Sequence, residues 1–129
     1  MIVVDTSVWI NALRSRESPE FRHLSELLDA DRVAMAIPVR VEILAGSARA
    51  QQAQLSRTLS ALPLFYPSES TWRRIEEWLV PMKRAGEWFG VGDLLIAGIA
   101  AEHQVPVWSL DSDFARMARL RLISLHRPS

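Results

Sequence analysis

The chain has 129 residues, of which 49% are hydrophobic, and it carries 15 basic and 15 acidic side chains and no cysteine. This length fits one domain, residues 1–129, and the missing cysteine excludes a disulfide framework, a zinc–thiolate site and a cysteine nucleophile. The zero net charge excludes the global basic surface of many nucleic-acid-binding proteins, and no apolar run approaches the roughly 20 residues that span a bilayer, so we expect a soluble, cytoplasmic protein.

The chain opens with Ile2, Val3 and Val4, three branched apolar residues that are followed at once by Asp5. A short run without polar alternation is typical of a strand that is buried on both faces, in the middle of a parallel sheet. Asp5 marks the end of this strand. Its carboxylate has two interpretations, because it can cap the next helix or act as a ligand that points into a crevice.

The rest of the chain alternates helices and short strands. Apolar periodicity predicts helices at 6–13, 19–28, 38–46, 50–62, 70–84, 93–103 and 111–120, and extended segments at 33–37, 64–66, 105–110 and 122–125. In the 70–84 helix, Trp72, Ile75, Leu79 and Met82 form the expected apolar face, and Pro81 should bend or break the helix. This alternation predicts an α/β fold with a mostly parallel sheet.

Four aspartates lie where a strand or loop passes into a helix, namely Asp5, Asp93, Asp111 and Asp113. Ligands of open parallel sheets bind at the carboxyl ends of the strands, so Asp5 and Asp111 should face the same region. For each aspartate taken alone, the more common role is an N-cap, because a carboxylate accepts hydrogen bonds from the first helical turn.

Glu42 falls on the less polar side of its helix, about 160° from Arg40 at 100° per residue. A glutamate there is costly unless it is paired or binds a metal, so we expect Glu42 to have a function. A buried salt bridge to one of the many arginines is the alternative.

Carboxylates that converge without histidine or cysteine favour a hard cation, Mg²⁺ or Mn²⁺. Such a site is typical of phosphodiester hydrolysis, because the ion activates a water and neutralises charge on the leaving oxygen. The three histidines are scattered, and we expect them to be structural or surface residues. Complete GxGxxG, GxxxxGK[ST] and GxSxG motifs are absent from the sequence, which disfavours nucleotide-loop and serine-hydrolase chemistry.

Four segments in a fixed order resemble a PIN-domain nuclease, and specifically a VapC-type toxin of a toxin–antitoxin pair. They are IVVDTSVWI, PVRVEILAG, VGDLLIAGIAAEHQVPV and SLDSDF, and together they extend from residue 2 to residue 114. The resemblance implies a three-layer α/β/α fold. It also implies an endoribonuclease, dependent on Mg²⁺ or Mn²⁺, that cuts an RNA such as transfer RNA.

The same resemblance assigns the site residues. It implies that Asp5, Glu42, Asp93 and Asp111 are catalytic, metal-binding acids and that Asp113 is a further ligand. Ser7 and Ser109 match positions where a hydroxyl orients a carboxylate or a water. The family also implies a homodimer and a cognate VapB-like antitoxin, which inhibits the enzyme by placing a segment, often with an arginine, in the acidic site.

Other interpretations stay open at this point. A non-catalytic module could use the acidic pocket only to bind a regulatory partner. A phosphorylated receiver domain is disfavoured, because Lys83, the only lysine, lies in a predicted helix rather than at the end of a strand.

Three arginines are candidates for phosphate contacts, namely Arg84, Arg116 and Arg119, although such residues are more often solvated surface positions. Gly98 weakens its helix by about 1 kcal/mol but allows close packing.

Overall fold

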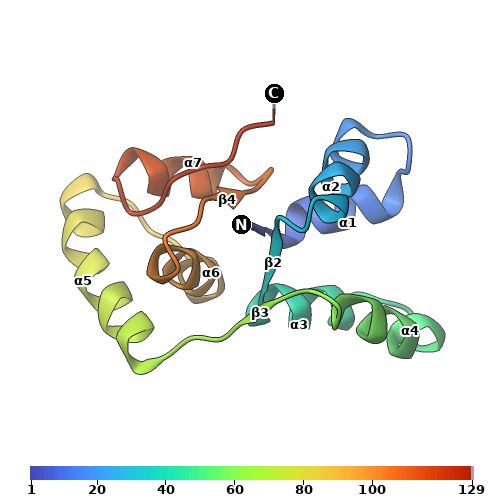
Figure 1. Ribbon diagram of the computed structural model, residues 1–129. Coiled ribbons are helices and arrows are strands. Elements are labelled where there is room, and N and C mark those ends of the chain that lie inside the picture. The colour runs from blue at the N-terminus through green and yellow to red at the C-terminus, as the bar shows by residue number, and fades with distance from the viewer. Residues whose placement is uncertain (129) are drawn as a thin grey trace.

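A four-stranded sheet runs through the middle of the protein in the computed structural model, which describes residues 1–128 (Figure 1). Its strands lie in the order β3-β2-β1-β4, and every neighbouring pair is parallel. Their bounds are β1 (Ile2–Val4), β2 (Val33–Ala36), β3 (Leu64–Phe65) and β4 (Val107–Trp108). The three residues of β1 are fully buried between two neighbouring strands, which confirms the predicted central strand.

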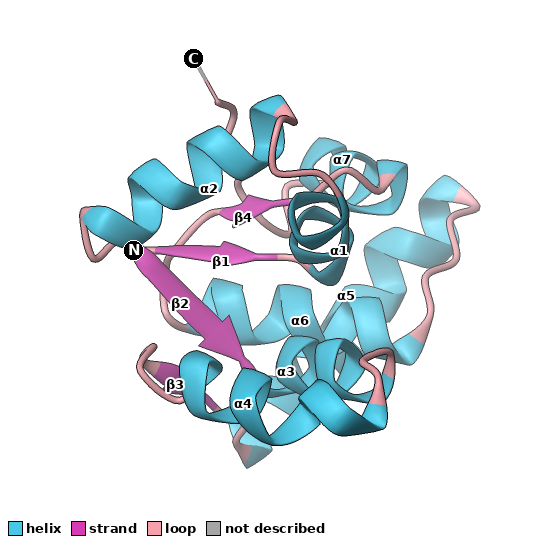
Figure 2. Ribbon diagram, turned by 90° about the vertical axis from the view of Figure 1, so that its right-hand side faces the viewer, coloured by secondary structure: helices cyan, strands magenta, loops and turns pink. Residues whose placement is uncertain are grey.

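Helices cover both faces of this sheet. Their bounds are α1 (Thr6–Arg14), α2 (Pro19–Asp29), α3 (Ile37–Ala45), α4 (Arg49–Leu59), α5 (Glu69–Ala85), α6 (Val91–Glu102) and α7 (Ser112–Arg119). In Figure 1, α5, α6 and α7 lie to the left of the sheet and α1 to α4 to its right, and Figure 2 views the molecule from the side of α1 to α4. The three-layer α/β/α fold is therefore confirmed.

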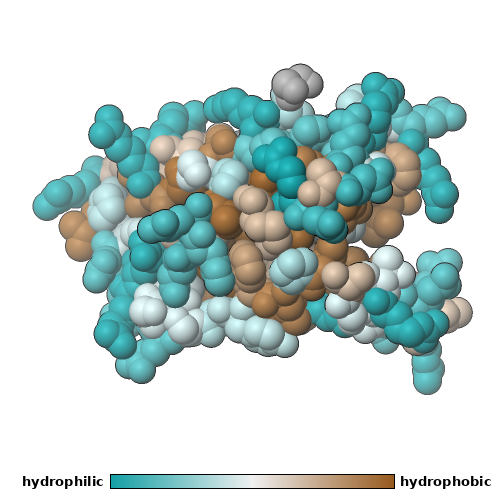
Figure 3. Space-filling model, in the orientation of Figure 1, coloured by the Kyte–Doolittle hydropathy of each residue, from teal (hydrophilic) through white to brown (hydrophobic). Residues whose placement is uncertain are grey.

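The apolar side chains gather between these layers. Helix α6 is buried over most of its length, including Leu94 and residues 96–100, because it lies between α5 and the sheet. On the face drawn in Figure 3, hydrophilic side chains occupy the outer edges and hydrophobic ones the middle. Within residues 1–128, no helix combines the length and the apolarity needed to cross a membrane.

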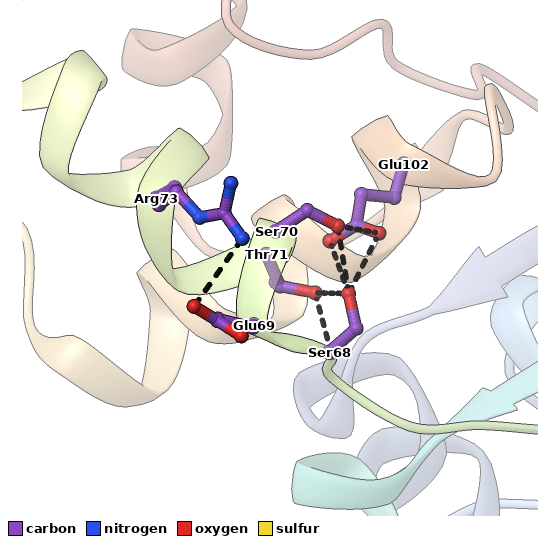
Figure 4. A network of polar contacts seen from close by, with 6 residues as sticks. All are labelled: Ser68, Glu69, Ser70, Thr71, Arg73 and Glu102. Carbon is purple, nitrogen blue, oxygen red and sulfur yellow. Dashed lines mark hydrogen bonds and ion pairs between the residues drawn. The ribbon is translucent and has the colours of Figure 1, made fainter.

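A polar network ties the start of α5 to the end of α6 (Figure 4). The backbone N–H of Ser68 donates to Thr71 Oγ1 at 2.8 Å, and the Ser68 hydroxyl donates to Glu102 Oε2 at 3.2 Å. Ser70 reaches the same carboxylate oxygen at 3.4 Å. The network holds Thr71, which is 1% exposed, against the face of α6 that contains Gly98.

We expect Gly98→Val to lower the free energy of unfolding by about 2–3 kcal/mol, or roughly 10 °C in Tm. A Cβ at residue 98 would lie 3.1 Å from Thr71 Cγ2 and 3.2 Å from Ile75 Cγ1, and the capping hydrogen bond keeps Thr71 from moving aside. Urea or thermal unfolding measures the effect. Gly92→Val is the matched control, because no atom lies within 4 Å of a Cβ there. Equal losses in the two variants would contradict close packing at Gly98.

Three details differ from the expected elements. Helix α5 continues through Pro81 to Ala85, because the burial of Trp78 and Met82 on the core offsets the lost hydrogen bond and the steric cost of a proline inside a helix. Its buried face consists of Thr71, Ile75, Trp78 and Met82, while Trp72 is 44% exposed.

The expected strand at 122–125 is reduced to an isolated bridge between Leu125 and Val107. Strand β4 is only two residues long, so it offers the chain end little edge for pairing. Backbone hydrogen bonds of Val107 with Ser124 and His126 nevertheless hold the C-terminal segment beside β4.

Candidate metal centre

The position of Asp5 follows from the register between the central strand β1 and the edge strand β4. Val4 pairs with Trp108, so the next residues, Asp5 and Ser109, emerge side by side at the carboxyl end of the sheet. Asp5 Oδ2 accepts hydrogen bonds from Ser109 Oγ and Ser7 Oγ, both at 2.7 Å, and a longer one from the Ser7 backbone N–H at 3.4 Å. The carboxylate is therefore the N-cap of α1, and it is also fixed by two hydroxyls.

The other carboxylate oxygen of Asp5 is differently placed. Within residues 1–128, no hydrogen bond reaches Oδ1, although Asp5 is only 5% exposed. This oxygen is not among the fully buried atoms, so it is accessible and its lone pairs are available to a cation.

Three further aspartates converge at the same edge of the sheet. Asp93 lies in the first turn of α6, Asp111 caps α7, and Asp113 lies in the first turn of α7. One oxygen from each of the three lies within 4.8 Å of the others. Asp111 also accepts a hydrogen bond from the Asp113 backbone N–H at 2.9 Å, so, like Asp5, it combines a capping role with a place in the acidic group.

This crowding raises the pKa of Asp93 from its ordinary value of 3.8 to about 7. Burial is the largest cause, followed by the negative charges of Asp111 and Asp5 and by a side-chain hydrogen bond with Asp113. The shift links Asp5 electrostatically to the group of three. Several carboxylates that repel one another at neutral pH form a site whose charge a divalent cation would balance.

Arg116 lies at one side of the acidic group. Its guanidinium donates to both Asp113 and Glu87, and it lies 4.9 Å from the centre of the Phe89 ring. The structure thus places Arg116 in ion pairs within the protein. Asp113 is partly neutralised by this contact, whereas Asp93 and Asp111 make no ion pair with a residue in 1–128.

Glu42 is placed differently from the expectation. It is exposed, so the predicted burial is wrong. Helix α3 contacts the core through Val39 and Ile43, whereas Ala45 and Gly46, which made the Glu42 side look apolar, are themselves exposed. Glu42 Oε1 accepts a hydrogen bond from Thr6 Oγ1 at 3.0 Å, and Thr6 is the neighbour of Asp5. Glu42 therefore approaches the acidic group from α3 without belonging to the set of three.

The donor set fits a hard cation. All available ligand atoms are carboxylate or hydroxyl oxygens, which suit Mg²⁺ or Mn²⁺. Asp93, Asp111 and Asp113 each bring one oxygen into the acidic group, and Asp5 lies close enough to raise the pKa of Asp93. Asp113 is also shared with Arg116, and Glu42 is bonded to Thr6.

Some partners in the site had no usable sequence signal. The spacing of Asp113 and Arg116 is that of a helical ion pair and could have indicated their contact. Thr6, Glu87 and Phe89 could not have been found in this way, because their contacts join residues that are distant in the sequence.

Comparison with known proteins identifies the family of this chain. The PIN domain family model matches residues 2–120. Over 125 residues the chain is 31% identical to Ribonuclease VapC11 of Mycobacterium tuberculosis, with 93% of each chain covered. Two solved structures share the fold: VapBC2 from Rickettsia felis bound to a DNA fragment from its promoter (TM-score 0.80, 21% identity, 100% of both chains) and VapBC-1 from nontypeable Haemophilus influenzae (TM-score 0.78, 22% identity, 98% and 97%). Because the family model covers nearly the whole chain, this protein belongs to the PIN domain family.

Proposed function

We propose that this protein is a Mg²⁺- or Mn²⁺-dependent endoribonuclease that acts as the toxin of a toxin–antitoxin pair. The observation that carries the proposal is the convergence of Asp93, Asp111 and Asp113 within 4.8 Å, beside Asp5, at the carboxyl end of the sheet. Membership of the PIN domain family and relatives named as ribonucleases support the choice of substrate.

Each acidic residue has a defined part in this proposal. Asp5, held by Ser7 and Ser109, would offer Oδ1 to the ion, and Asp93 and Asp111 would complete the ligand set. A bound ion would lower the pKa of the attacking water and balance charge on the scissile phosphate. Because the pKa of Asp93 is about 7 without a cation, binding of the ion at neutral pH would release a proton from this carboxyl group.

Three further residues would position the metal ligands. Arg116 fixes Asp113 and leaves Asp93 and Asp111 as the unpaired acids. Glu42, exposed and bonded to Thr6, would orient the attacking water or contribute to a second ion. Asp113 would serve as an outer ligand.

The expected macromolecular partners follow from the relatives. The similar solved structures are VapBC toxin–antitoxin complexes, so we propose a VapB-like antitoxin as the cognate inhibitor. A homodimer and an RNA substrate such as transfer RNA belong to the same proposal.

Metal removal tests the enzymatic activity directly. We expect the purified protein to cleave an end-labelled RNA in Mg²⁺ or Mn²⁺. The cleavage rate should fall by at least about 100-fold in EDTA and should recover when the ion is restored. Sequencing of RNA ends after induction in cells would then identify the substrate. Cleavage that is undiminished in EDTA would contradict the metal site. Absence of both cleavage and calorimetric Mn²⁺ binding would instead favour a non-catalytic module that only binds a partner.

A further inference from the structure

A cavity of about 590 Å³ opens beside the candidate metal centre. Four segments form its walls: the end of β4 with the turn that follows it, the start of α7, the start of α2, and the C-terminal segment 125–128. In Figure 1, β4 lies between α7 on its left and α2 on its right. The volume lies within the range of about 300–1,000 Å³ that is usual for small-ligand sites.

The cavity is continuous with the acidic group through two residues. Ser109 lines the cavity and donates its hydroxyl hydrogen bond to Asp5. Asp111 also lines the cavity and belongs to the group of three aspartates. A ligand in the cavity would therefore lie immediately next to whatever is bound at the metal centre.

The apolar part of the wall is rigid. Trp108 and Phe114 are 3% and 1% exposed, and Leu110 and Leu125 add aliphatic surface. Behind Trp108, the His23 and His126 rings stack with centroids 5.1 Å apart and share an Nε2–Nε2 hydrogen bond of 2.8 Å. Because the rings of Trp108 and Phe114 are almost fully covered, the apolar surface that a ligand would meet comes mainly from Leu110 and Leu125, and Trp108 and Phe114 support this surface from beneath.

The polar part of the wall offers both donors and acceptors. The carboxylates of Glu20 and Asp111 can accept hydrogen bonds, and the guanidinium of Arg127 can donate them. The hydroxyl of Ser112 can do both. Burial, His23 and Arg32 lower the pKa of His126, so this side chain adds no positive charge at neutral pH. With two carboxylates and one guanidinium, the lining suits a neutral, polar-edged ring rather than a phosphate group.

We propose that this cavity binds the nucleobase adjacent to the scissile phosphate of the RNA substrate, with Glu20 and Arg127 reading its edge. The inference rests on the proposed ribonuclease function and adds a site that determines sequence preference. An RNA base is favoured because the cavity is large enough for one nucleoside, shares Ser109 and Asp111 with the acidic group, and combines accessible aliphatic surface with hydrogen-bonding groups.

Two variants test the site without altering the acidic group. Ala115→Phe places a ring in the cavity, and Arg127→Gln changes an exposed side chain whose loss should not affect folding. Arg57→Gln, at an exposed position of α4, is the matched control. We expect both cavity variants to raise KM for a random-sequence RNA by about 10-fold, to change kcat by less than about threefold, and to weaken or alter the base preference at one position beside the cut. The control should match the parent protein.

A second measurement does not require cleavage. RNA that contains photoreactive 4-thiouridine is irradiated with the full-length protein, and the crosslinked peptides are mapped by mass spectrometry. We expect crosslinks in 108–115 and 125–128 that are lost in Ala115→Phe. If the parent protein cleaves RNA while both variants keep its KM, base preference and crosslinks, the cavity assignment is wrong and the ribonuclease stands. If both variants keep the KM, base preference and crosslinks of the parent protein but bind the antitoxin more weakly, the cavity is a binding site for the antitoxin instead.

The crosslinks also separate the two proposals when no cleavage is seen. Crosslinks at the cavity without RNA cleavage would overturn the proposed activity and keep the base-binding site. Neither crosslinks nor cleavage in the parent protein would overturn both.

Discussion

The Asp93→Asn variant is expected to lose RNA cleavage by more than about 100-fold and, in EDTA at pH 8, to be more stable than the parent protein. The first effect follows from the loss of a charged ligand at the candidate metal centre. The second follows because the parent carboxylate is forced to ionise near three others, whereas the asparagine amide is neutral and similar in shape. Cleavage assays and thermal unfolding measure the two effects separately.

The sign of the pH dependence is determined by the raised pKa of Asp93, which is about 7 in the folded protein against 3.8 ordinarily. Between these values the folded state retains a proton that the unfolded state has lost. The stabilisation from this group is therefore complete below about pH 4 and is lost as the pH rises through 7. Because Asp93 is only half-buried, solvent screening reduces the effect to about 1 kcal/mol, or a few °C in Tm.

The comparison with the parent must therefore depend on pH. The Tm of Asp93→Asn should exceed that of the parent at pH 8 and approach it at pH 5, in EDTA throughout. Glu77→Gln, at an exposed position in the middle of α5, removes one charge away from the site and should give the same small difference at both pH values. A gain in stability that is larger at pH 5 than at pH 8 would contradict the crowding of carboxylates around Asp93.

Replacement of Asp5 by asparagine and replacement by alanine are expected to differ in their effects on stability. Asp5→Asn keeps one oxygen that can accept the hydrogen bonds from Ser7 and Ser109 but loses the charge. We expect cleavage in Mg²⁺ to fall by more than about 100-fold while the free energy of unfolding changes by less than about 1 kcal/mol. Asp5→Ala also leaves two serine hydroxyls without their acceptor and removes the cap of α1, so it should cost about 2–3 kcal/mol.

Urea unfolding and cleavage assays on the same preparations distinguish the two roles of Asp5. Ser18→Ala is a useful control, because Ser18 caps α2 and accepts from the Phe21 N–H but lies outside the acidic group. It should cost about 1 kcal/mol and leave cleavage unchanged. An Asp5→Asn protein that cleaves RNA at the parental rate would show that Asp5 is a cap only.

The sequence was most informative where the physical signal is local. The apolar run at residues 2–4 predicts a buried central strand, and β1 is fully buried and has a neighbouring strand on each side. Because parallel strands end at the same edge of a sheet, the positions of Asp5 and Asp111 after two strands were sufficient to bring them to one region. The alternation of elements likewise predicts an α/β fold with a mostly parallel sheet, and the sheet is parallel throughout.

Local signals were misleading where the burial of a helix face depends on what packs against it. The short helix around Glu42 has apolar residues on several sides, and only contact with the core decides that Val39 and Ile43 are buried while Glu42 is exposed. Trp72 is exposed for the same reason, since the buried stripe of α5 passes through Thr71 instead.

The sequence by itself therefore determined the fold class, the central strand and the common region of Asp5 and Asp111, because apolar periodicity and strand-end positions are properties of short segments. The tertiary structure alone decided which oxygens meet. It joined Thr6 to Glu42 and Arg116 to Glu87, raised the pKa of Asp93, and formed the cavity between β4, α2, α7 and the C-terminal segment. Each of these features depends on contacts between segments that are far apart in the chain, and their geometry is set by packing across the whole core.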